Sequence, residues 1–130
     1  MPWAVADVVV GSVGTSSTTQ FLTLDATHGV RPLALAETSA PAANAAVTAN
    51  TNTRVVNAGV NSGAAATALT TNIVNSLTFE AGGGLTINNF RDLRLESGGI
   101  LVPNGQQSGR PQTDNVCRIT GGASRLTSGG

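Results

Sequence analysis

The sequence predicts an all-β protein whose short strands stack as repeats, an architecture known as a β-solenoid. Between Leu77 and Val102, apolar residues recur in pairs two positions apart, as in Leu77 and Phe79, so both members of a pair face the same side of a strand. Glycine-rich breaks separate these pairs. A phrase at 94–99, Arg-Leu-Glu-Ser-Gly-Gly, returns at 125–130 as Arg-Leu-Thr-Ser-Gly-Gly. Repetition of this kind is typical of chains whose units bury their core against one another.

The composition favours a thin core of stacked aliphatic residues. The 130 residues include three Phe, one Trp and no Tyr, and only 11% are charged. All positive charges are arginines scattered along the chain, and the formal net charge is zero. We therefore expect no nucleic acid as a partner. We also expect no membrane insertion by this segment, because no apolar run approaches the ~18 residues of a span.

The first 35 residues are predicted to form strands that flank the repeats. Apolar runs indicate strands at 4–10, 20–24 and 30–35, with a turn-forming linker rich in Gly, Ser and Thr after the first. Gly11 and Gly14 follow an apolar strand, as in a phosphate-binding loop. Such a loop also requires Gly-Lys-Ser/Thr, and the chain has no lysine. We therefore expect no nucleotide here, and no cofactor or metal elsewhere.

Residues 36–72 are rich in Ala, Thr and Asn and predict an irregular rung. Strands are expected at 53–57 and 72–79, and a short helix near 40–47, starting after Pro41, is the alternative. Residues 73–130 are predicted to form regular rungs, truncated at the C-terminal end, with strands that begin at Leu77, Leu85, Leu93 and Ile100.

The period-two pattern also assigns faces to the side chains of these rungs. Asp92, Arg94 and Glu96 are expected to face solvent. The side chains expected to point into one stacked core are those of Leu85, Ile87, Leu93, Leu95, Ile100 and Val102.

One loop is expected to protrude from the rungs. The segment 103–113 contains two prolines and two glycines, which favour a loop over a strand. Contacts with other molecules often come from such loops, so the candidate contact residues are Asn104, Gln106, Gln107 and Arg110. Cys117, the only cysteine, is expected to be a small buried residue of a strand at 116–120.

The strand pattern also resembles a known family, the autotransporter-associated β-strand repeat. The residues that carry the resemblance are Asn75–Leu77, Gly84–Ile87, Leu93–Val102 and Ile119–Gly122. The N-terminal part is similar to the stretch that often precedes this repeat in large bacterial proteins, at Pro2–Val5, Asp7, Phe21 and Gly29–Leu33.

The resemblance implies a right-handed parallel β-helix within the passenger-type region of a bacterial secreted, outer-membrane or cell-surface protein. The expected role is structural, in adhesion or surface display, as part of a longer exported protein. The expected partners are neighbouring rungs of that parent chain and a surface glycan or protein.

A carbohydrate-active enzyme, either a polysaccharide lyase or a glycosidase, is the alternative, because parallel β-helices also carry such activities. The best local carboxylate pair is Asp92 and Glu96, on one face of one strand. Four residues of strand separate them by about 13 Å, which exceeds the ~5–9.5 Å of glycosidase pairs. His28, the only histidine, is expected in a surface turn. We therefore predict no catalytic residues and no enzyme activity.

A row of threonines is a further candidate binding surface. Thr23, Thr78 and Thr86 each lie between two apolar residues and are expected to face outward. Aligned threonines could hold a flat hydroxylated ligand, although they also stabilise ordinary sheets.

Overall fold

The computed structural model describes residues 5–9, 17–80, 83–102 and 118–128, and within them β-strands predominate. The only helix there is η1 (Leu35–Glu37), a 3-10 helix of three residues. The strands form three sheets, of which one is antiparallel and two are parallel. The expected all-β class is therefore confirmed.

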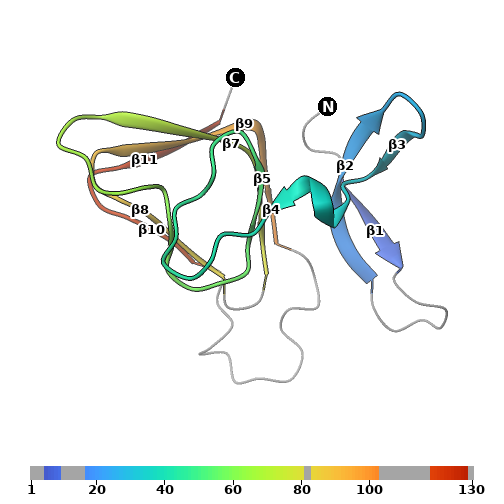
Figure 1. The fold of residues 1–130 in the computed structure, drawn as a ribbon, viewed down its shortest axis with the longest axis horizontal. Helices are drawn as coiled ribbons and strands as arrows, with labels where there is room; N and C mark the ends of the chain where they lie inside the picture. The colour runs from blue at the N-terminus through green and yellow to red at the C-terminus, as the bar shows by residue number, and fades with distance from the viewer. Residues whose placement is uncertain (1–4, 10–16, 81–82, 103–117, 129–130) are drawn as a thin grey trace.

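The N-terminal sheet is an antiparallel meander of β1 (Val5–Val9), β2 (Ser17–Asp25) and β3 (Gly29–Pro32). It lies beside the parallel sheets (Figure 1), and β2 contacts β9. Phe21 on β2 is buried. The third strand was expected to run to residue 35 but ends at Pro32, and the chain then enters η1.

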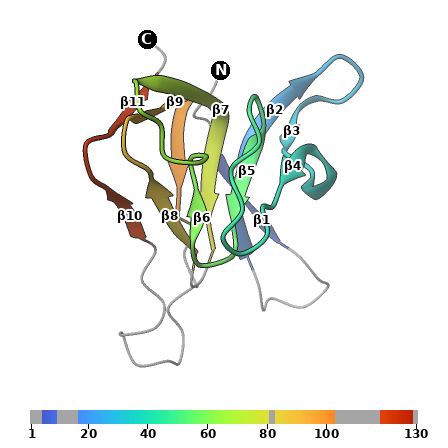
Figure 2. The same ribbon diagram turned by 60° about the vertical axis from the view of Figure 1, so that its left-hand side comes forward.

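β4 and β5 both belong to the five-stranded parallel sheet, and from β5 onward successive strands alternate between the two parallel sheets. Each strand pairs with the strand of the same sheet that precedes it in the chain, so one circuit through both sheets, here called a coil, stacks on the one before. Figure 2 shows this succession across the molecule from β4 to β11. The five-stranded sheet contains β4 (Thr38–Ser39), β5 (Asn52–Val55), β7 (Thr70–Phe79), β9 (Arg91–Leu101) and β11 (Arg125–Ser128). The three-stranded sheet contains β6 (Val60–Asn61), β8 (Gly84–Ile87) and β10 (Arg118–Gly121).

The core lies between the two parallel sheets and consists of aliphatic residues with one phenylalanine. Its members are Val47, Val55, Val60, Val74, Leu77, Phe79, Leu85, Ile87, Leu93 and Leu95. The predicted inward direction of Leu85, Ile87, Leu93 and Leu95 is therefore confirmed. No helix occurs at 40–47, where the alternative placed one.

The prediction is wrong for Ile100 and Val102, whose side chains are 42% and 54% exposed. Ile100 is the register partner of buried Leu77, so it lies in the same row. On its other side, β11 pairs with β9 only as far as Leu95. In the described part of the chain, no strand stacks over Ile100 on that side, and its side chain remains half in solvent.

Two further sequence expectations require correction. Gly98 and Gly99 were expected to separate two strands, but β9 runs through both, with a register irregularity opposite Val74–Ser76. The repeated phrase also does not stack on itself. Leu126 pairs with Leu93, 33 positions earlier, whereas the phrase repeats at 31. Because the two alignments differ by two residues, the same side chains of β11 face the core in both.

Asparagine side chains connect successive coils. Among the described residues, six asparagines donate from Nδ2 to backbone carbonyl oxygens located earlier in the chain, for example Asn75 to Asn50 at 3.2 Å and Asn61 to Asn44 at 3.0 Å. The other four are Asn52, Asn57, Asn72 and Asn88. The abundance of Asn, which suggested irregular structure between 36 and 72, thus serves to satisfy backbone carbonyls between coils.

Candidate functional site

The candidate contact residues Asn104, Gln106, Gln107 and Arg110 lie outside the described residues, so their expected role stays a prediction. Cys117 also lies outside them. The described residues do place the remaining candidates, which are the carboxylates of β9, the single histidine and the threonines.

Asp92 was expected to face solvent, but it is buried. Its register partner on β11 is Arg125, whose Nε and Nη2 donate to the two carboxylate oxygens at 3.0 and 2.6 Å. This pairing lowers the pKa of Asp92 and raises that of Arg125. Asp92 therefore joins two coils as an ionised acceptor, and the exposed guanidinium of Arg125 covers it.

Glu96, the other half of the weighed carboxylate pair, is exposed as expected and accepts a hydrogen bond from Nη2 of Arg94 at 2.8 Å. Asp92 and Glu96 are thus each bound to a different arginine. A glycosidase general acid must hold a proton at working pH, which requires a raised pKa. The lowered pKa of Asp92 is the opposite of that requirement.

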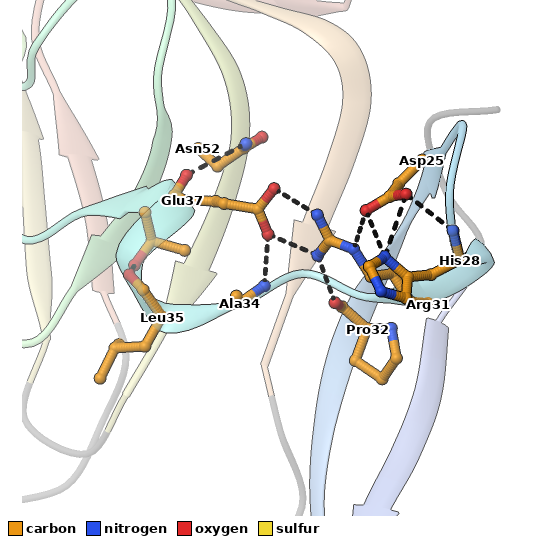
Figure 3. A network of polar contacts seen from close by, with 9 residues as sticks. Asp25, His28, Arg31, Pro32, Ala34, Leu35, Glu37 and Asn52 are labelled. Carbon is orange, nitrogen blue, oxygen red and sulfur yellow. Dashed lines mark hydrogen bonds and ion pairs between the residues drawn. The ribbon is translucent and has the colours of Figure 1, made fainter.

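His28 lies in the exposed turn between β2 and β3, as expected. Its Nδ1 is 3.1 Å from Oδ2 of Asp25, and its backbone N–H donates to Oδ1 at 2.8 Å. Figure 3 shows that Asp25 also accepts from Nε of Arg31, at 2.8 Å. His28 is therefore part of the turn that Asp25 organises.

Arg31 connects this turn to the segment that leads into the coils. Its Nη1 and Nη2 donate to the two carboxylate oxygens of Glu37 in η1, at 2.6 and 2.8 Å (Figure 3). Glu37 in turn accepts from the backbone N–H of Ala34 at 2.7 Å. Arg31 thus lies between two carboxylates, one in each segment.

The electrostatics of this network follow from these hydrogen bonds. Arg31, and then the Ala34 N–H, lower the pKa of Glu37 to about 2. Arg31, and then the backbone N–H of His28, lower the pKa of Asp25. The two carboxylates raise the pKa of Arg31, Glu37 contributing most. All three groups are therefore ionised at neutral pH. In this state Arg31 forms ion pairs with both carboxylates and so connects the β2–β3 turn to η1; we call this arrangement the Arg31 clamp.

The three threonines do not form one row. Thr23, Thr78 and Thr86 belong to three different sheets. Thr86 instead pairs with Thr120 on β10 and Asn61 on β6, and the Thr86 and Thr120 hydroxyl oxygens are 3.2 Å apart. The candidate Thr23–Thr78–Thr86 row is therefore not formed, and the structure instead has a row of Asn61, Thr86 and Thr120.

Sequence reasoning missed the turn between β8 and β9. There Phe90 has a φ of 57° and a side chain that is 46% exposed. Asn89 beside it is exposed, and no described residue hydrogen-bonds to its amide side chain. The only signal in the sequence is that Phe90 is one of four aromatic residues and follows two asparagines.

Comparisons with known proteins give no relative: no family model, no curated protein and no solved structure matches the chain. Among the described residues, no group of His, Cys, Asp and Glu is arranged to hold a metal ion. Helices long and apolar enough to cross a membrane are likewise not found in that part of the chain.

Proposed function

We propose that the chain is a structural β-helical repeat segment of a bacterial extracellular or cell-surface protein of the autotransporter type, and that the two parallel sheets are the walls of a right-handed parallel β-helix. The observation that carries this proposal is the pairing of each strand with its predecessor one coil earlier, in both sheets. This arrangement makes a rigid column in which each coil contacts its neighbours.

The interior of the column supports a structural role. Its hydrophobic core is aliphatic apart from Phe79, and asparagine amides donate hydrogen bonds between successive coils. The described carboxylates discussed above are bound to arginines, so nothing in them favours the carbohydrate-active alternative. Adhesion or surface display is the role that fits such a column in a passenger-type region.

Display on the surface of a Gram-negative bacterium tests this role. The chain is fused to an outer-membrane carrier, with an epitope tag at its exposed end, and the adhesion of the cells to glycan-coated and protein-coated surfaces is counted. We expect tag exposure and adhesion above that of the carrier alone.

A matched pair of variants tests whether the gain in adhesion depends on the folded column or comes from the carrier. Val74→Asp places a charge in the core, where Val74 is fully buried, and should abolish the gain in adhesion. Thr71→Asp, on an exposed side chain of the same strand, should leave the gain intact. Adhesion that is equal for the carrier, the wild-type chain and Val74→Asp would contradict the proposal.

A further inference from the structure

The turn at Phe90 combines backbone strain with exposure. A bulky residue at positive φ is an outlier, because this region is costly for side chains other than Gly, Asn and Asp. The other described non-glycine residues at positive φ are Asn44 and Asn50, which tolerate it. Phe90 is also 46% exposed, so a large part of this residue is accessible to a ligand.

The backbone of this turn is held by the coils on both sides. The Phe90 N–H donates to the carbonyl of Ala123 in the following coil at 2.9 Å, and its carbonyl accepts from the N–H of Thr70 in the preceding coil at 3.0 Å. Strained residues that the surrounding structure fixes in this way are found preferentially at ligand-binding and other functional sites. The phenyl ring is thus presented on a rigid support.

The residues that neighbour Phe90 in the chain or across the turn are polar or small. Asn89 offers an amide with no partner among the described residues, and the ionised Asp92–Arg125 pair follows two residues further along β9. Gly122 faces Asn89: a Cβ atom there would lie 2.4 Å from the Asn89 Oδ1 atom. Gly122 therefore leaves room for the amide beside the turn.

We infer that the Phe90 turn is a binding site for a neutral carbohydrate, with the ring stacking on the apolar face of one pyranose and the Asn89 amide hydrogen-bonding to a sugar hydroxyl. An aromatic face attracts the weakly positive C–H groups of a sugar. A second exposed apolar residue, Leu69, directly precedes Thr70 in the chain, so an apolar patch at this turn comprises two residues at most. Such a patch is far below the ~800 Å² per partner of a stable protein interface, whereas one sugar ring can cover it.

This inference rests on the proposed adhesion role and gives it a ligand class and a site. The test is NMR titration of the chain with neutral hexose and N-acetylhexosamine oligosaccharides up to millimolar concentration. The readouts are the ring resonances of Phe90, the side-chain amide of Asn89 and the dissociation constant.

We expect saturable shifts at Phe90 and Asn89 with at least one oligosaccharide. Phe90→Asn should weaken its binding about tenfold or more, as loss of an aromatic anchor does, while the melting temperature stays equal or rises because Asn tolerates positive φ. Leu24→Asn, at an exposed apolar residue of β2, is the control and should leave binding unchanged.

The remaining outcomes overturn the inference. They are the absence of saturable shifts with every oligosaccharide, wild-type affinity in Phe90→Asn, or a fall in melting temperature that would give Phe90 a packing role. Binding of the chain to glycans that survives Phe90→Asn would leave the adhesion role standing and reject only this site. Adhesion in the display experiment to protein-coated surfaces alone would likewise reject the carbohydrate and keep the adhesion role.

Discussion

Truncating two leucines that occupy the same place in consecutive coils measures how much stacking contributes to the free energy of unfolding. Leu93 on β9 and Leu126 on β11 are register partners, yet Leu93 is fully buried and Leu126 is 38% exposed. Changing leucine to alanine removes three carbons, or about 2.4 kcal/mol at ~0.8 kcal/mol per buried CH₂. In the closed core around Leu93 a cavity adds to this loss, so we expect about 3–5 kcal/mol.

Leu126→Ala should cost less for two reasons. The exposed part of the side chain contributes no burial, which reduces the transfer free energy to about 1.5 kcal/mol. In addition, solvent reaches this site, so little closed cavity remains. Urea unfolding at equilibrium, followed by circular dichroism, gives both values if the m-value is unchanged. Equal losses for the two variants would refute the register and the stacking.

Three further predictions follow. Asn88→Asp should reduce the free energy of unfolding by about 1–3 kcal/mol, because a carboxylate replaces the donor to the Gly63 carbonyl. The control is the same change at the exposed neighbour, Asn89→Asp, which should alter the free energy of unfolding, measured in urea, by no more than about 0.5 kcal/mol. Because the folded-state pKa of Glu37 is lowered from 4.5 to about 2, its contribution is present above pH 4.5 and is lost as the pH falls towards 2. In Arg31→Gln the free energy of unfolding should therefore fall less steeply as the pH is lowered through this window. The same pH dependence in the variant and the wild-type chain would reject the Arg31 clamp. Purified chain incubated with pectin, alginate and common glycans should release no reducing or unsaturated ends, and turnover abolished by Asp92→Asn would restore the enzyme alternative.

The strand class and part of the core could be predicted because they depend on local alternation. Leu85 and Ile87, like Leu93 and Leu95, are two residues apart and each has a coil on both sides, so their faces follow from periodicity alone. Ile100 continues the same pattern but is exposed, because β11 does not extend over it. Alternation predicts the direction of a side chain and leaves open what covers it.

The remaining features depend on the stacking register, which is a non-local property. Asp92 is paired with Arg125 because the coil length brings the two residues into register, whereas the 31-residue phrase indicates a different alignment. The strained turn at Phe90 also depends on the carbonyl of Ala123 and the N–H of Thr70, which belong to other coils. A single sequence contains no direct signal for these contacts.

Cysteine cross-linking between β9 and β11 tests the in-register stacking most directly. Thr127 is the register partner of Arg94, whereas the repeated phrase would align it with Glu96. Neighbouring strands are ~4.8 Å apart, within disulfide range, and a shift of two residues puts the Cα atoms about 8 Å apart, beyond it. In a Cys117→Ser background, the stacking predicts rapid oxidation of the Arg94→Cys/Thr127→Cys pair and little of the Glu96→Cys/Thr127→Cys pair. The reverse preference, or no difference between the pairs, would contradict it.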